Sequence, residues 1–329
     1  MAGRKLIIEA ALHEFVPKST NPHIPYGADE VAADTASCVA AGLSFLHFHA
    51  RHGVTGAQLW TDPEPYREAI LAMRRRGVSA ELPWYPTYGG LDLASFSHIA
   101  ALAADPAIRL AVAAIDIGTD NLNDFDPATR QFIDPDSVKT LSHAAAKDLF
   151  DLCRKLKLRP YIGVFEPGHL RHVGTYIDKG WIEPPVILRF FFSDFAPFGL
   201  PPHPECVGMY AEMIEMVMPD VPVEWFVACA GPSIWDLAPA AIAAGGHVRA
   251  GIGQYHPTSW PERSGEKPTN AEQVARLARL AQSMGREPAS PAEARAMLGL
   301  DLKSPVTLRG GRTDGGAAPE VRDLPPNHH

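Results

Sequence analysis

Two histidines and an arginine alternate along a short hydrophobic run near the start of the chain. In the sequence Phe-Leu-His-Phe-His-Ala-Arg, strand alternation puts His47, His49 and Arg51 on one face and the apolar residues on the other. Two imidazoles two residues apart can converge on one cation, and imidazole suits zinc and its first-row neighbours. Arg51 would then attract an anionic substrate or pair with a carboxylate. The alternative is a pair of hydrogen-bonded structural histidines without an ion.

Short β-branched or aromatic runs alternate eight times with longer helical patterns. The runs that predict strands are Lys5–Leu12, Ser44–Arg51, Ser79–Thr87, Leu110–Gly118, Arg159–Glu166, Val186–Ser193, Val223–Ala230 and His247–Gln254. The patterns that predict helices are Ala28–Ala41, Pro65–Arg76, Phe96–Ala104, Ser142–Leu156, Leu170–Lys179, Glu205–Met218, Ser233–Ala244 and Asn270–Met284. Because parallel strands need crossover helices, these units predict an α/β fold of the (β/α)8 TIM barrel type, with a doubly wound open sheet as the alternative.

Two segments depart from a minimal barrel. Residues 120–140 are polar and long for a connection between strand and helix, so we expect a lid over the carboxyl ends of the strands. Residues 301–329 lose periodicity and apolar content, which predicts a flexible tail. Residues 1–300 are therefore expected to form a single barrel domain.

The composition is that of an ordinary globular protein without a basic surface. The chain has 329 residues, of which 46% are hydrophobic and 21% charged, and its formal net charge is −8. This balance disfavours nucleic acid and an anionic membrane as partners, so we expect a small molecule. No stretch approaches the roughly 18 apolar residues of a membrane span, and the start of the chain lacks a signal peptide. The four cysteines lack CxxC spacing, which indicates reduced, packed thiols in a cytoplasmic protein.

Polar side chains follow most of the predicted strands. The active site of a TIM barrel is assembled at the carboxyl ends of its strands, which makes these side chains candidates. They include Glu14 after the first strand, Thr87 after the third, Asp116 near the end of the fourth and Arg249 within the eighth. The chain has no GxxxxGK[ST] loop, no GxGxxG after an early strand and no GxSxG elbow. Nucleotide hydrolysis, a Rossmann dinucleotide site and an α/β-hydrolase triad are therefore disfavoured.

Several of these motifs together resemble the β-keto acid cleavage enzyme family. The segments that carry the resemblance are Ile7–Glu14, Asn21–Pro25, Ala41–Gly42, His47–Arg51 and Gly245–Arg249. The combination of HxHxR with GGHxR is fairly specific, and the likeness runs from about residue 5 to residue 298. Members of this family are (β/α)8 barrels that hold zinc or a similar divalent ion. They convert a β-keto acid and acetyl-CoA into acetoacetate and a new acyl-CoA.

The resemblance implies a role for each candidate residue. His47 and His49 become ligands of Zn2+ or another divalent first-row metal, and Arg249 becomes the partner of the substrate carboxylate or of its developing charge. Glu14 becomes a substrate-site residue, and Thr87 matches a hydroxyl that binds the keto acid. We therefore expect Arg249, Glu14 and Thr87 to be catalytic, and the same three with Asp116 to bind substrate. Acetyl-CoA is the expected co-substrate, and we also expect a homo-oligomer.

Three positions depart from the family pattern. The family commonly has Gly-x-Glu-Asp near the end of the eighth strand, which supplies a third metal ligand and then a catalytic acid/base. Gly253 and Gln254 stand there in this chain. Ala114 replaces a hydroxyl that commonly lies two residues before the Asp116 position. Since a base must remove a carbon-bound proton, and such help is typically worth about 10²- to 10⁴-fold in rate, the loss bears on function.

The missing groups have several possible replacements. Glu14 could complete the coordination sphere or act as the base, because strand one lies between strands eight and two in a closed barrel. His256 could serve instead, Glu166 is a further candidate for the base, and water or substrate could complete a two-histidine site. Three functions consequently stay open: the acyl transfer of the family, a metal-assisted lyase or hydrolase reaction without CoA, and a non-catalytic ligand-binding barrel.

Overall fold

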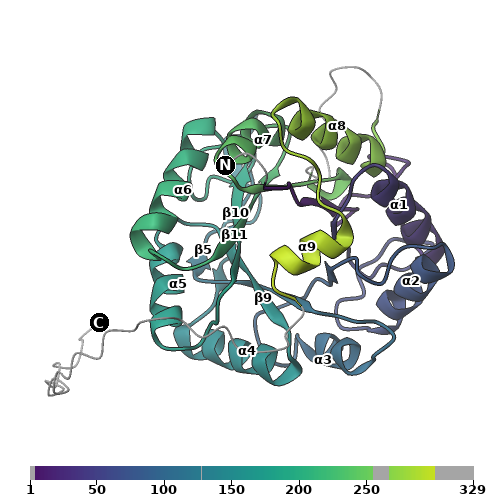
Figure 1. Cartoon of the computed structure of the whole chain (residues 1–329), viewed down its shortest axis with the longest axis horizontal. Helices are drawn as coiled ribbons and strands as arrows, with labels where there is room; N and C mark the ends of the chain where they lie inside the picture. The colour runs from purple at the N-terminus through teal and green to yellow at the C-terminus, as the bar shows by residue number, and fades with distance from the viewer. Residues whose placement is uncertain (1–3, 127, 255–266, 301–329) are drawn as a thin grey trace, which may run out of the picture.

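Eight parallel strands form a nearly closed barrel surrounded by helices (Figure 1). The structure, a computed structural model, describes residues 4–126, 128–254 and 267–300. The strand order is β3-β2-β1-β12-β11-β10-β9-β4, and its two end strands, β3 and β4, also contact each other. The predicted (β/α)8 barrel is confirmed, and the open doubly wound sheet is wrong.

The strands and helices lie close to their predicted positions. The barrel strands are β1 (Ile8–Ala11), β2 (Phe45–His47), β3 (Trp84–Tyr85), β4 (Val112–Asp116), β9 (Arg159–Val164), β10 (Val186–Ser193), β11 (Val223–Ala230) and β12 (His247–Ala250). The outer helices are α1 (Ala28–Ala40), α2 (Glu64–Arg75), α3 (Ser97–Ala104), α4 (His143–Leu156), α5 (His169–Asp178), α6 (Pro204–Val217), α7 (Ile234–Ala243) and α8 (Asn270–Ser283). Several strands are shorter than predicted. β3 has only two residues because Pro83 and Pro86, which carry no N–H, flank it.

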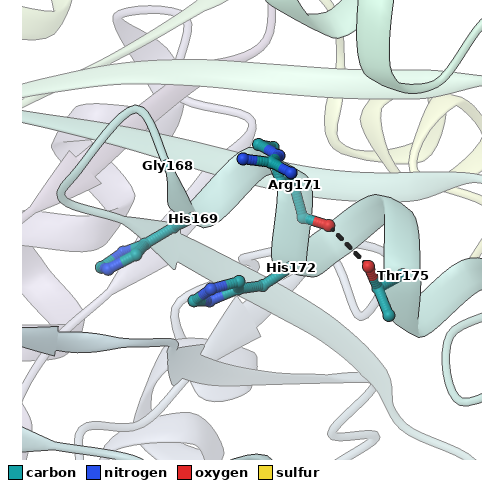
Figure 2. A pocket seen from close by; sticks show the side chains of 5 residues that line it. All are labelled: Gly168, His169, Arg171, His172 and Thr175. Atoms are coloured by element: carbon teal, nitrogen blue, oxygen red, sulfur yellow. Dashed lines mark hydrogen bonds between the residues drawn. The ribbon is translucent and has the colours of Figure 1, made fainter.

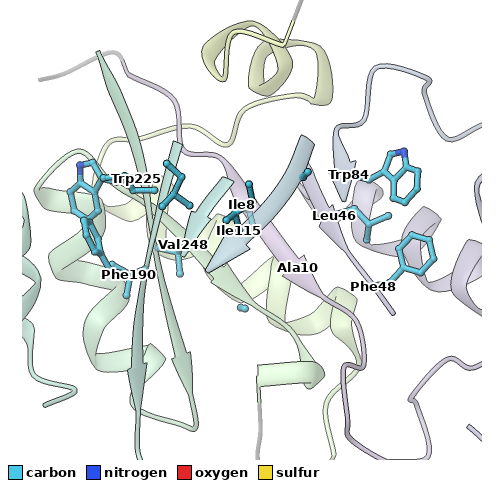
Figure 3. Close-up of a cluster of buried hydrophobic side chains, with 14 of the residues drawn as sticks. Ile8, Ala10, Leu46, Phe48, Trp84, Ile115, Phe190, Trp225 and Val248 are labelled. Carbon is cyan, nitrogen blue, oxygen red and sulfur yellow. The ribbon is translucent and has the colours of Figure 1, made fainter. Parts of the chain in front are cut away.

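Alternation along the strands divides the core into two layers. Outward-facing residues such as Leu46, Trp84 and Phe190 pack against the helices (Figure 3). Inward-facing residues such as Phe45 and Tyr161 belong to a separate cluster inside the barrel. The side chains that continue this inner layer toward the carboxyl ends of the strands are polar, and they form the candidate site.

A short helix that the sequence did not predict closes the amino-terminal end of the barrel. Helix α9 (Pro291–Met297) starts at a capping box made by Ser290 and Glu293, and Figure 1 shows it across the barrel opening. Its neighbours Leu298 and Leu300 are buried in the inner cluster with Phe45. Seven residues are too few for a clear helical period, so the pattern search missed it. A ligand must therefore enter from the carboxyl ends of the strands.

The predicted lid folds into two small antiparallel ladders. One joins β5 (Thr119–Asp120) to β8 (Lys139–Thr140), and the other joins β6 (Phe125–Asp126) to β7 (Gln131–Phe132). The Lys139 ammonium lies 2.6 Å from the buried Asp120 carboxylate and holds the base of the segment. The function of this segment as a lid stays a prediction.

Three further expectations concern the whole chain. The four cysteines are buried and form no disulfide, which confirms packed thiols. Among the described residues, no helix has the length and apolar character needed to cross a membrane. The predicted tail, residues 301–329, lies outside the described residues.

Candidate metal centre and active site

Glu14, His47 and His49 converge at the carboxyl end of the barrel. Their ligand atoms all lie within 4.8 Å of one another, and Glu14 Oε1 is 3.6 Å from His47 Nε2. His47 ends β2, His49 follows two residues later, and Glu14 lies in the loop after the neighbouring strand β1. Within the three described ranges, no other trio of His, Cys, Asp or Glu meets this distance. Two imidazoles and one carboxylate form a known ligand set of catalytic zinc.

The hydrogen bonds of the two histidines leave their Nε2 atoms free for an ion. The Nδ1 of His47 is 3.1 Å from the backbone carbonyl of Tyr85, and the Nδ1 of His49 is 3.0 Å from Gln58 Oε1. Because a carbonyl oxygen only accepts, each Nδ1 carries the proton and each Nε2 keeps its lone pair. The Gln58 amide also donates to the backbone carbonyl of Glu14 at 2.7 Å. Gln58 thus orients two members of the cluster.

Burial keeps both imidazoles in the neutral form that binds metal. It is the largest cause that lowers the pKa of His49, to about 3, and the neighbouring Arg51 guanidinium lowers it further. The pKa of His47 is also well below its usual value, first because of burial and then because of His49 and Arg189. At neutral pH neither ring takes up a second proton, so no proton competes with a metal ion for either Nε2.

Glu14 occupies the space where the family pattern places a glutamate. A Cβ atom on Gly253 would lie 2.9 Å from Glu14 Cγ and 2.9 Å from the backbone carbonyl oxygen of Ala11. A larger residue at position 253 would therefore displace the loop that carries Glu14. Glu14 itself has a φ of 33°, which non-glycine residues seldom adopt, so its position depends on the surrounding contacts.

Arg249 connects the three-residue cluster to the interior of the barrel. Its side chain is 2% exposed, and its Nη2 forms an ion pair with Glu14 Oε1. Its Nη1 donates to the Tyr85 hydroxyl at 3.0 Å, and its Nε lies 3.6 Å from Glu9 Oε1. Burial lowers the pKa of Arg249 to about 10 against the opposing effect of Glu9, so the guanidinium stays charged at neutral pH.

A buried polar layer that the sequence reasoning missed lies beneath the cluster. Glu9 is fully buried on β1 and accepts hydrogen bonds from the hydroxyls of Tyr85 and Tyr161, the second at 2.6 Å. Arg189 on β10 donates to the Tyr85 hydroxyl at 2.7 Å. The sequence contains one indication of this layer: Glu9 and Arg189 are each a single charged residue inside an otherwise apolar strand.

Asp116 contacts this buried polar layer. Thr87 is held instead by side chains that lie outside the barrel. Asp116 Oδ1 lies 3.1 Å from Arg189 Nη2, so the chain of contacts runs from Glu14 through Arg249, the Tyr85 hydroxyl and Arg189 to Asp116. The backbone of Thr87 instead contacts side chains of the outer helices. Its carbonyl accepts from His98 at 2.7 Å, and its amide donates to the Tyr66 hydroxyl at 3.2 Å.

Arg51 has a different role from the one expected. Its guanidinium donates to the backbone carbonyls of Gly56 and Val16, both at 2.7 Å, and lies over the Tyr26 ring. The strand ends at His47, so the predicted alternation does not extend to Arg51. The arginine instead ties the loop after Glu14 to the loop that carries Gln58.

The other candidates for the missing base are engaged or undescribed. Glu166 Oε1 accepts from the backbone amide of Gly199 at 2.9 Å and so joins two loops. Gln254, which stands where the family pattern has the acid/base, is buried, and its backbone carbonyl accepts from the Gly231 amide at 2.8 Å. His256 lies outside the described residues.

A second hollow lies at the start of helix α5 and contains two histidines. Its volume is about 460 Å³, and Figure 2 shows its lining residues, Gly168, His169, Arg171, His172 and Thr175. His169 Nε2 is 3.5 Å from Asp120 Oδ1, so this ring of helix α5 packs against the base of the predicted lid. Burial is the main cause that lowers the pKa of His169 to about 4, which leaves the ring neutral. The geometry indicates a structural role.

Comparisons with known proteins agree on one family. A family model described as beta-keto acid cleavage enzyme matches residues 5–300. The 3-keto-5-aminohexanoate cleavage enzyme of Fusobacterium nucleatum is 28% identical over 90% of this chain and 98% of its own length. A protein of Rhizobium meliloti named 3-dehydrocarnitine:acetyl-CoA trimethylamine transferase is 24% identical over 86% of this chain and 92% of its own length. The solved structure of ObcA with oxaloacetate shares the fold, with a TM-score of 0.64 and 14% identity over 85% of this chain and 68% of that chain.

Replacing Gln58 is expected to weaken metal binding without unfolding the protein. The Gln58→Ala variant loses the acceptor that orients His49 and the donor that holds the Glu14 backbone. Loss of such an outer partner typically lowers metal affinity about 10- to 100-fold. Competition with a chelator measures the affinity, and Gln282→Ala, at an exposed glutamine on α8, is the matched control. Equal affinities for the two variants would contradict this role.

Proposed function

The chain belongs to the beta-keto acid cleavage enzyme family, and from this membership we propose that it transfers an acyl group from a β-keto acid to CoA. In the proposed reaction, a β-keto acid and acetyl-CoA give acetoacetate and a new acyl-CoA. The observation that carries the proposal is the convergence of Glu14, His47 and His49 beside the buried Arg249. The acetyl-CoA in the name of the Rhizobium meliloti relative supports the same co-substrate.

The proposed metal is a divalent first-row ion, with zinc as the first choice. His47 and His49 would hold it through Nε2, and Glu14 would supply the third ligand. The neutral, correctly oriented imidazoles and the nearby carboxylate fit this assignment. Such an ion, when bound, would polarise the keto oxygen of the substrate.

The balance of atoms defines what the side chains must do. Acetoacetate contains the carboxymethyl group of the keto acid and the acetyl group of acetyl-CoA. The new bond therefore joins the carbon next to the substrate carboxylate to the acetyl carbon, and the proton removed comes from that carbon. Formation of this bond breaks the thioester of acetyl-CoA and releases the CoA thiolate. The thiolate then takes the original acyl group as the bond from this carbon to that group breaks, and the carbon regains a proton.

Arg249 would anchor the substrate carboxylate and orient the carbon that loses its proton. A guanidinium can bind both carboxylate oxygens, and its burial strengthens the contact. Thr87 and Asp116, after β3 and at the end of β4, are proposed to complete the substrate site. Glu14 could take the proton if it does not bind the ion, because it lies between Arg249 and His47.

Metal content and acetoacetate formation test this proposal together. The purified protein is expected to carry about one divalent ion per chain and to form acetoacetate only when acetyl-CoA and a β-keto acid are both present. Elemental analysis and a coupled acetoacetate assay measure these outcomes. A His47→Ala/His49→Ala variant should lose both properties, whereas His203→Ala, at an exposed histidine before α6, should keep them. Full occupancy in the double variant would exclude the ligand assignment.

The Glu14→Gln variant separates the two roles of that carboxylate. A ligand role predicts reduced metal affinity. A base role predicts normal metal content with slow exchange of the substrate's acidic proton for deuterium. Proton NMR follows that exchange without requiring turnover. Full activity of Glu14→Gln would exclude both roles.

Arg249→Lys is expected to lower kcat/KM about 30- to 1000-fold. Lysine keeps the charge but loses the planar pair of donors, and loss of a buried charge-assisted contact costs about 2–4 kcal/mol. Steady-state kinetics measures the change, while circular dichroism checks that the variant folds. Arg171→Lys, at an exposed arginine on α5, is the matched control. Unchanged kinetics of Arg249→Lys would show that the guanidinium does not bind substrate.

We also propose that the protein is a homo-oligomer. Four large apolar side chains on the predicted lid are exposed, and the rings of Phe125 and Phe132 pack on each other, which suits an interface with another copy: Phe125 36%, Phe132 48%, Ile133 65% and Val138 51%. Light scattering after size-exclusion chromatography measures the mass in solution, and a single chain mass of 35.6 kDa would exclude an oligomer.

A further inference from the structure

We propose that the acyl substituent of the β-keto acid is uncharged and apolar, and that three phenylalanines opposite the metal ligands select it. These residues, Phe165, Phe191 and Phe198, are called the aromatic wall here. The inference rests on the proposed function, because it concerns the part of the substrate that becomes the new acyl-CoA.

The aromatic wall lies directly across the barrel from the proposed metal ligands. β10, which carries Phe191, is four strands away from β2 in either direction around the barrel. β9, which Phe165 follows, is likewise four strands from β1, which precedes Glu14. A substrate whose keto oxygen faces the ion and whose carboxylate faces Arg249 therefore extends its substituent toward this wall.

The three rings form one continuous surface beside Arg249. The ring centroids of Phe165 and Phe191 are 4.3 Å apart with an interplanar angle of 18°, and Phe198 meets Phe165 at 5.2 Å. Phe191 faces the interior because it alternates with Arg189 and Ile187, which are both inward-facing. Its ring centroid is 5.9 Å from the Arg249 guanidinium carbon. A carboxylate on Arg249 therefore places the rest of the substrate next to Phe191.

Small side chains lie beside the wall on the neighbouring strand. On the neighbouring strand β11, the register pairs Phe191 with Ala228 and Ser193 with Ala230. Both alanines face the interior, because they alternate with Phe226 of the inner cluster. Alanine at these positions adds neither bulk nor a polar group beside the aromatic wall.

The charged side chains near the wall already have partners among the described residues. Arg189 pairs with Asp116 at 3.1 Å, and Lys139 pairs with Asp120 at 2.6 Å. An anionic substituent would thus lose its hydration without gaining an unpaired cation, which is costly. An apolar substituent gains free energy from the same burial.

A cationic substituent is disfavoured even though aromatic rings can bind cations. The Arg189 guanidinium carbon lies 4.3 Å from the Phe191 ring centroid, and the Lys139 ammonium lies 3.8 Å from that of Phe165. These two cations already use the rings as partners and would repel a third. The wall therefore differs from an aromatic cage for a quaternary ammonium.

Two pairs of substrates that match in shape test the charge preference. 3-Oxohexanoate and 3-oxoadipate differ by a terminal methyl or carboxylate, and 5,5-dimethyl-3-oxohexanoate and 3-dehydrocarnitine differ by a central carbon or nitrogen. We expect kcat/KM in the acetoacetate assay to favour the uncharged member of each pair at least about 50-fold. A charged member that is equal or better in either pair would overturn the proposal.

Binding measurements separate this proposal from the proposed function. Calorimetric titration of the metal-loaded protein with the same four acids, without acetyl-CoA, needs no turnover. Tighter binding of both uncharged members without acetoacetate formation would uphold the substrate preference and contradict the acyl transfer. Equal or tighter binding of a charged member would overturn the preference whatever the activity.

Phe191→Ala connects the preference to the wall. We expect its KM for 3-oxohexanoate to rise about 10-fold or more, while KM for acetyl-CoA changes little. Phe191→Leu should restore most of the loss, because it replaces apolar surface. Met216→Ala, which removes a side chain that is 71% exposed on α6, is the control. An unchanged KM in Phe191→Ala would overturn the role of the wall, and circular dichroism confirms that each variant folds.

Discussion

A carboxylate buried inside the barrel is the constraint on which the candidate site depends. Glu9 has no exposed surface, and removing an isolated carboxylate from water costs several kcal/mol unless its partners compensate. Tyr85, Tyr161 and Arg249 provide that compensation from three other strands. Arg249 stays beside Glu9 through Nε and beside Tyr85 through Nη1, and its Nη2 pairs with Glu14 at the carboxyl end of the barrel. The neutralisation of one buried charge thus sets the position of the group proposed to bind substrate.

The loop after β1 places a carboxylate beside the strand end where the family pattern has a glutamate. Gly253 stands where the family pattern has a glutamate, and the Glu14 side chain fills the space that Gly253 leaves. In this chain the loop that carries Glu14 in this position requires a small residue at 253, because an added Cβ would lie 2.9 Å from Glu14 Cγ and from the Ala11 carbonyl oxygen. Contacts from Gln58 and Arg51 hold the two loops together. With Glu14 as the proposed third ligand, two imidazoles and one carboxylate would still bind the ion. The carboxylate would then come from the loop after β1 instead of from the end of β12.

The mouth of the barrel has two unlike halves. The proposed metal ligands and Arg249 gather on the side of β1, β2 and β12, whereas phenylalanine and alanine, together with the paired Arg189, line the side of β9, β10 and β11. Helix α9 closes the opposite end with apolar side chains, so both halves serve a single entrance. This division suits a substrate with one acidic end and one variable end. The acidic end is common to all β-keto acids, and the variable end is where members of one family can differ.

The sequence by itself determined the barrel, its eight strand and helix pairs, and the histidines and arginine of the site. Periodicity and the HxHxR and GGHxR motifs are local patterns, so they can be recognised in the sequence without knowledge of the fold. Only the tertiary structure decided which polar groups meet, since Glu9 and Tyr85 are 76 residues apart and Tyr85 and Arg249 are 164 apart. It also showed that Arg51 binds backbone carbonyls, that α9 closes the barrel and that Phe191 faces Arg249. Contacts across a closed barrel join residues that are far apart in the sequence and follow no repeating spacing. Because burying an unpaired charge is costly, the buried charged groups lie beside partners that neutralise them.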